Sequence, residues 1–132
     1  MEKRQLMGNK TCFCDTGLPF DVCCGLYLIN NQKAPTALAL MRSRYSAYAT
    51  QNADYLLETT HVSERAYYSK EEILKWATSN KWQKLEILSS TEETVEFKAY
   101  FMDLNNKPQI HYEFSTFKFE KGSWYYVDGK FE

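Results

Sequence analysis

The chain has 132 residues, the length of one ordinary domain with room for a small appendage. Its hydrophobic fraction of 44% and charged fraction of 25% are those of a soluble globular protein, and an aromatic content of 16% favours strands around a bulky core or a lined cavity. The formal net charge is -1, so no basic field attracts nucleic acid or an anionic membrane. We therefore expect neither as a partner.

The N-terminal sequence also predicts the cellular compartment of the protein. The first ten residues are polar and charged and contain no apolar signal core, and no apolar run in the chain is long enough to cross a bilayer. We expect a cytoplasmic protein, in a compartment that keeps thiols reduced. Its cysteines are then better explained as metal ligands than as disulfides.

All four cysteines fall within one short segment near the N-terminus. The ligand set that we predict is Cys12, Cys14, Cys23 and Cys24. Four thiolates satisfy one zinc ion tetrahedrally and leave no open coordination position, which is typical of a structural rather than a catalytic site. Gly17 and Pro19 in the intervening loop help the chain fold back. The alternatives are two loop-closing disulfides or reactive thiols, although neighbouring cysteines pair poorly with each other.

Composition divides the chain into two predicted units. Residues 1–30 hold every cysteine and show little periodicity, whereas residues 31–132 are strongly patterned. The boundary lies in the polar, turn-rich stretch 30–33. We expect a small zinc knuckle followed by a larger domain.

The patterned unit begins with helices. After Pro35 and Thr36, one apolar stripe recurs at spacings of three and four and predicts a first helix; its members are Leu38, Met41, Tyr45 and Tyr48. A second, short helix is predicted near Asn52 and Asp54, which are good N-caps. The segment 69–72 has the form of a capping box and predicts a third helix that ends near Asn80.

The period then changes to two. Alternating apolar residues predict four consecutive strands over 82–89, 95–101, 110–119 and 124–127, separated by turn residues. Helices followed by sequential strands predict an α+β domain in which an antiparallel sheet is covered on one face.

The cysteine segment resembles the SEC-C motif, a zinc knuckle also found at the end of the preprotein translocase motor ATPase. That motif usually reads C-P-C-G-S-G-K, a few residues, then C-C or C-H. All four ligand positions match here, as do Gly17 and Phe20, whereas Phe13, Asp15 and Leu18 depart from the pattern. Because the translocase motif contacts an export chaperone, the resemblance implies a protein partner for the knuckle.

The rest of the chain resembles the YchJ-type family of bacterial proteins. The matching segments are A-P-T-A-L-A-L-M-R-S-R-Y-S-A-Y at 34–48, D-Y-L-L at 54–57 with Thr60 and His61, E-x-S-x-F at 113–117 and G-x-W-Y-Y-V-D-G at 122–129. The resemblance implies a nuclear-transport-factor-2-like (NTF2-like, or cystatin-like) cone, in which helices close over a curved antiparallel sheet. It implies no particular activity.

Folds of this kind often enclose a pocket. We predict four side chains as candidates for its lining: Arg42, Tyr45, His61 and Glu113. Alternation places Glu113 on one strand face with His111, so a buried Glu113 would need a partner, and Arg42 or Arg44 on the first helix could provide it. Structural roles are the alternative for each, and for His61 in particular the satisfaction of helix-terminal carbonyls.

Two classes of function remain open. The first is a protein-interaction module stabilised by structural zinc. The second is a small enzyme or small-ligand receptor that uses the cone pocket, with Glu113 or His61 as a general base. The pattern contains no nucleophile–base–orienter triad, so no catalytic residue is assigned, and it predicts no oligomeric state.

Overall fold

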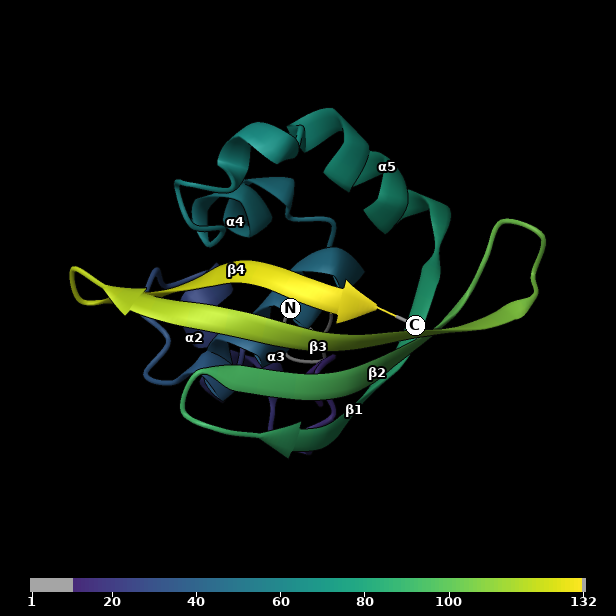
Figure 1. Ribbon diagram of the computed structural model, residues 1–132. Coiled ribbons are helices and arrows are strands. Elements are labelled where there is room, and N and C mark those ends of the chain that lie inside the picture. The colour runs from purple at the N-terminus through teal and green to yellow at the C-terminus, as the bar shows by residue number, and fades with distance from the viewer. Residues whose placement is uncertain (1–10, 132) are drawn as a thin grey trace.

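The computed structural model describes residues 11–131 (Figure 1). Its helical elements are η1 (Phe20–Val22), α2 (Gly25–Leu28), α3 (Ala37–Ala49), α4 (Ala53–Glu58), η2 (Arg65–Tyr67) and α5 (Lys70–Ser79). The strands are β1 (Lys81–Ser90), β2 (Thr94–Met102), β3 (Pro108–Glu120) and β4 (Ser123–Phe131). The fold is therefore α+β, as the sequence predicts. Among the described residues, no helix combines the length and the apolar character needed to cross a bilayer.

The three main helices begin where the sequence predicts, each at a capping residue. The side chains of Thr36, Asn52 and Ser69 each accept a hydrogen bond from a backbone N–H in the first turn of the helix that follows, at 3.0 Å. Each cap satisfies a donor that the helix itself leaves free. At the end of α5, the side-chain amide of Asn80 donates to the carbonyl of Trp76 at 2.9 Å. The predicted helices and the predicted stop are confirmed.

The strands form one antiparallel sheet in the order β1-β2-β3-β4. In Figure 1, α2 and α3 lie behind the sheet and α4 and α5 lie above β4. Register shifts interrupt β1 twice and the β3–β4 pairing once. Such shifts bend strands and increase their twist, so the sheet is curved. β4 continues to Phe131, beyond the predicted 124–127, because the shift breaks its alternation near Val127.

One face of the sheet is buried and carries polar as well as apolar groups. Val95, Phe97 and Ala99 of β2 point inward and are almost completely buried. Opposite them on β3, Glu113 and Ser115 are also buried. The face predicted to hold Glu113 is thus the inner face. The exposed face carries Ile110 and Phe114 from the alternating set.

Helix α3 is buried on more sides than a single apolar stripe predicts. It contacts three strands and the helices α2, α4 and α5. Ser43 and Ser46 are fully buried, and their small side chains let neighbouring elements pack close to the helix. The hydroxyl of Ser43 lies 2.7 Å from the carbonyl of Leu40 and 2.6 Å from the Tyr55 hydroxyl. The Ser43 hydroxyl is therefore satisfied inside the protein.

The cysteine segment shares this core. Cys12, Cys14 and Cys24 belong to the same cluster of buried residues as Leu40 and Tyr45 of α3. The predicted boundary near residue 30 falls in the turn that follows α2. Residues 1–10 of the predicted first unit, and with them the segment on which the prediction of no secretory signal depends, lie outside the described residues.

Candidate metal centre and internal cavity

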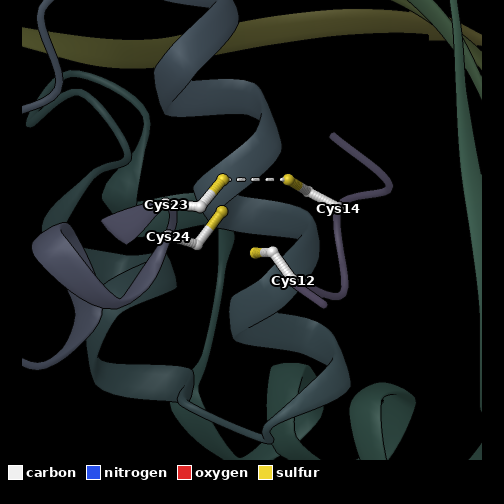
Figure 2. A group of neighbouring side chains, drawn as sticks. All are labelled: Cys12, Cys14, Cys23 and Cys24. Carbon is white, nitrogen blue, oxygen red and sulfur yellow. Dashed lines mark hydrogen bonds between the residues drawn. The ribbon is translucent and has the colours of Figure 1, made fainter. Parts of the chain in front are cut away.

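The four predicted ligands meet at one point beside α3. Figure 2 shows Cys12 and Cys14 on one segment and Cys23 and Cys24 on another, with their sulfur atoms turned toward one another. The four Sγ atoms lie within 4.8 Å of one another, and those of Cys14 and Cys23 are 3.5 Å apart. All four cysteines are free thiols, so the alternative of two loop-closing disulfides is wrong for this structure.

This donor set fits a thiolate-bound metal ion. A tetrahedral zinc ion with Zn–S bonds of about 2.3 Å needs sulfur atoms about 3.8 Å apart, which is close to the spacing present here. Three of the four cysteines are buried and the fourth is half-buried, so the centre is largely shielded from water. Thr16 lies 3.1 Å from the Cys23 sulfur and supplies a nearby polar group.

The thiols are held too close together to ionise independently. Hydrogen bonds with Cys14 and then Cys24 lower the pKa of Cys12 far below its ordinary value. The hydrogen bond with Cys12 raises the pKa of Cys14 to about 11, and bonds with Cys12 and Cys14 raise the pKa of Cys24. One thiolate therefore suppresses ionisation of its neighbours. A cation that offsets their mutual repulsion is what allows all four to ionise.

A tight loop brings the two cysteine pairs together. Thr11 and Pro19 form an antiparallel bridge, and the N–H of Cys12 donates to the carbonyl of Leu18 at 2.7 Å. Asp15 and Gly17 take positive φ angles of 66° and 86° inside the loop. The usual SEC-C pattern has glycine where this chain has Asp15, and a left-handed conformation explains that preference.

Hydrogen bonds at Cys14 and Asp15 fix the loop to the main body. The guanidinium of Arg42 on α3 donates to the carbonyl of Cys14 at 2.8 Å. The carboxylate of Asp15 accepts a hydrogen bond from the backbone N–H of Leu85 at 2.8 Å. Because β1 is an edge strand, this N–H would otherwise lack a strand partner. Asp15 departs from the motif, and the sequence alone gives no indication of this contact 70 residues away.

A separate cavity of about 230 Å³ lies between α3 and the inner face of the sheet. Its lining comes from α3 (Met41, Arg44, Tyr45 and Tyr48), from the sheet (Trp82, Phe97, Ala99, His111, Glu113, Tyr126 and Phe131) and from Thr60, Tyr68, Ile73 and Trp76. The structure therefore places two of the predicted candidates, Tyr45 and Glu113, in this lining, and places Arg42 and His61 outside it.

Glu113 forms a closed network with groups of the sheet. Its carboxylate accepts hydrogen bonds from Ser115 at 2.6 Å and Tyr126 at 2.8 Å, and His111 lies 2.9 Å away. Burial alone would raise the pKa of Glu113, but the three hydrogen bonds outweigh it and the pKa lies below its ordinary value. The predicted pairing of Glu113 with Arg42 or Arg44 is wrong, because neighbours on its own sheet satisfy the carboxylate.

The two arginines and His61 have other partners. Arg42 points to the cysteine loop, and Arg44 donates to the carbonyl of Leu56 at 2.9 Å near the end of α4. His61 is buried beside β4, where its ring lies 2.7 Å from Glu120 and contacts Tyr125 edge-on. The ring also lies 2.8 Å from the Ser63 hydroxyl, so the alternative role, a contact with helix-terminal carbonyls, is wrong. Because a helix turns about 100° per residue, Arg42 and Arg44 point to nearly opposite sides of α3, and the sequence alone does not say which of them faces the sheet.

Comparison with known proteins agrees with this architecture. The family model described as "YchJ, middle NTF2-like domain" matches residues 36–129. The chain belongs to the YchJ family. The match begins at the N-cap of α3 and spans the sheet, so the four-stranded sheet and its helices are an NTF2-like domain.

Relatives in the family match most of the chain. A UPF0225 protein of Enterobacter sp. is 40% identical, over 92% of this chain and 83% of its own length. A UPF0225 protein of Geobacter sulfurreducens is 37% identical, over 89% and 77%. The solution structure of a SEC-C motif containing protein from Rhodopseudomonas palustris aligns with a TM-score of 0.84 at 35% identity, covering 92% of this chain and 98% of that one. A crystal structure of a SEC-C motif containing protein from Psychrobacter arcticus gives 0.78 at 32%, covering 93% and 83%.

The wall around Glu113 yields a test of this geometry. A side chain added at Gly129 would overlap the Glu113 carboxylate, so Gly129→Ala should lower the free energy of unfolding by about 2 kcal/mol. In a Glu113→Ala background the overlap is absent, and the same substitution should cost less than about 0.5 kcal/mol. Urea denaturation of the four proteins of this cycle gives both values. Equal costs in the two backgrounds would contradict the close contact.

Proposed function

We propose that the protein binds one structural zinc ion through Cys12, Cys14, Cys23 and Cys24, and that this zinc stabilises a surface for protein interaction. The convergence of four free thiols is the observation that carries the metal assignment, because four thiolates complete a tetrahedral zinc site. Zinc suits four thiolates better than the harder cations, which prefer oxygen ligands. The SEC-C motif of the structural neighbours supports the same choice.

The proposed role of the zinc is to hold the knuckle, which we define as residues 11–29, in its folded shape. The knuckle contains one short helix and one 3-10 turn, too little regular structure to support itself. Metal ligation supplies on the order of 10 kcal/mol in small zinc sites and is coupled to their folding. The same ligation keeps the Cys14 carbonyl and the Asp15 carboxylate in reach of α3 and β1.

Metal analysis tests this assignment directly. The purified protein should carry one equivalent of zinc, and Cys24→Ser should lose it, with Ser46→Ala beside the site as the control that keeps it. Cobalt(II) in place of zinc should give the intense visible absorption of tetrahedral thiolate coordination. Free thiols with no bound metal after refolding in zinc, or the absorption of an octahedral cobalt site, would contradict the assignment.

The outer surface of the knuckle supports a role in protein interaction. Phe13, Leu18, Val22 and Ile29 are between 38% and 67% exposed although all four are apolar. A groove lined by Phe13, Phe20, Leu28 and Ile29 separates the knuckle from the loop between α3 and α4. We infer that a protein partner binds this apolar surface, since exposed apolar groups gathered on one small element are typical of interaction sites.

Charge-introducing variants test the partner proposal. Leu18→Glu and Val22→Glu should each abolish a complex that the tagged wild-type protein forms in its host, whereas Leu104→Glu should retain it. Leu104 is 76% exposed in the β2–β3 turn, far from the knuckle in sequence and on a different element. Quantitative mass spectrometry of cross-linked complexes measures the difference. A complex lost equally in all three variants, or in none, would contradict binding through the knuckle.

The enzyme alternative is less well supported. A general base at neutral pH needs a carboxyl group with a raised pKa, and the pKa of Glu113 is lowered. His61 lies outside the cavity, so neither predicted base suits that role.

We also infer that sheet and helices form the cystatin-like cone that the family resemblance implies. The position of the cavity between α3 and the inner face of the sheet supports this.

A further inference from the structure

The cavity beside α3 contains a buried cation with hydrogen-bonding capacity to spare. Arg44 is 7% exposed and lines the cavity. All of its hydrogen bonds to described residues use one nitrogen, Nη1, which donates to Leu56 and to the hydroxyls of Thr59 and Thr60. The guanidinium also lies over the ring of Tyr126, 4.5 Å from its centroid. Nη1 and the stacked ring fix the group in place.

The other two nitrogens of Arg44, Nε and Nη2, have no hydrogen-bond partner among the described residues. They are nevertheless not sealed in the interior, because within residues 11–131 no buried side-chain nitrogen or oxygen lacks a partner. Nε and Nη2 therefore remain accessible in the wall of the cavity. These two donors form the edge of the guanidinium that binds a carboxylate through two parallel hydrogen bonds.

The carboxylate on the opposite wall, that of Glu113, does not offer free hydrogen-bonding positions to a cationic ligand as Arg44 does to an anionic one. Glu113 already has three hydrogen-bonding neighbours, His111, Ser115 and Tyr126. Of the oppositely charged pair Arg44 and Glu113, Arg44 is thus the one with hydrogen-bonding groups left free in the lining. Tyr48 lies one helical turn after Arg44 on α3 and also lines the cavity. Its hydroxyl makes no hydrogen bond among the described residues, so it adds a further donor. Burial raises the pKa of Tyr48, so its hydroxyl stays protonated and can donate.

The size and walls of the cavity restrict the ligand further. An apolar cavity of about 150 Å³ accommodates benzene, so about 230 Å³ admits one aromatic ring with a short substituent. The walls beyond Arg44 are aromatic, and Trp82 and Phe97 contribute two of the rings. Tyr68, Trp76 and Phe131 are 41%, 45% and 60% exposed at the rim and mark the side from which a ligand enters.

We propose that this cavity binds a small aryl carboxylate, with the carboxylate on Nε and Nη2 of Arg44 and the ring among the aromatic side chains. The Tyr48 hydroxyl donates to the same carboxylate. The zinc ion takes no part in this contact. The site would make the protein a receptor for an aromatic acid, in addition to the interaction surface on its knuckle.

Three isosteric probes test the proposal on the full zinc-loaded chain. Phenylacetate, phenylacetamide and phenethylammonium share a ring and differ in the charge of the substituent. Titrations followed by calorimetry and by the fluorescence of Trp76 and Trp82 should show phenylacetate binding at least about tenfold more tightly than the amide, since a charge-assisted bidentate contact is lost. The Arg44 Nε–H resonance should shift with the acid and not with the amide.

Variants identify the site without depending on one fragile residue. Arg44→Lys keeps the positive charge but removes the fork, and should weaken phenylacetate about tenfold. Because Arg44 also ties down α4, two further variants leave it intact. Ala99→Leu fills the cavity and should abolish binding, and Tyr48→Phe should weaken it several-fold, with the exposed Tyr67→Phe as its matched control.

Four results would overturn the proposal. Equal affinity for acid and amide would mean that Arg44 does not bind a carboxylate. Tightest binding of the ammonium probe would assign the selectivity to Glu113. Binding that survives Ala99→Leu would place the ligand elsewhere. No binding of any probe at millimolar concentration, by a protein that circular dichroism shows to be folded, would mean that the cavity takes no such ligand.

Discussion

Helix α3 contacts both the cysteine knuckle and the sheet. The rest of the structure depends on which side chains of α3 face the knuckle and which face the sheet. Arg42 binds the knuckle through the carbonyl of Cys14, and Ser43 contacts Tyr55 of α4. Arg44 binds the end of α4 and lines the cavity, and Tyr45 forms part of the cavity wall. The side chains of these four consecutive residues thus point in different directions around the helix axis and contact different parts of the protein.

This arrangement links the proposed metal centre to the domain core. The knuckle is held by hydrogen bonds that join Cys14 to Arg42, Asp15 to Leu85 and Cys12 to Ser46, and by burial of its cysteines against α3. Asp15 satisfies the edge of the sheet at Leu85, so the knuckle also covers part of an edge strand that would otherwise be open to pairing. Zinc in this position would act as a staple for the whole domain. It would not be confined to a detachable appendage, although composition alone divides the chain near residue 30.

Local patterns predicted the elements and the ligand set, because the information for both is close in sequence. An apolar stripe located α3, capping residues located α4 and α5, alternation located the strands, and the spacing of the cysteines identified a closed donor set. The cavity could not be predicted in the same way. Its lining depends on the rotation of α3 relative to the sheet, which decides that Arg44 faces it and Arg42 does not. Glu113 was placed on the correct face together with His111, but its hydrogen bond with Tyr126 of β4 became apparent only from the three-dimensional arrangement.

Amide hydrogen exchange with and without zinc tests most directly whether the knuckle is part of the domain. The amide of Leu85 reports the contact with Asp15, and the amides of α3 report packing against the cysteines. If the metal staples the knuckle to the domain, removal of zinc by a chelator should reduce protection in α3 and at Leu85 as well as in residues 11–29. A loss of protection confined to residues 11–29, with α3 and Leu85 unchanged, would contradict the account.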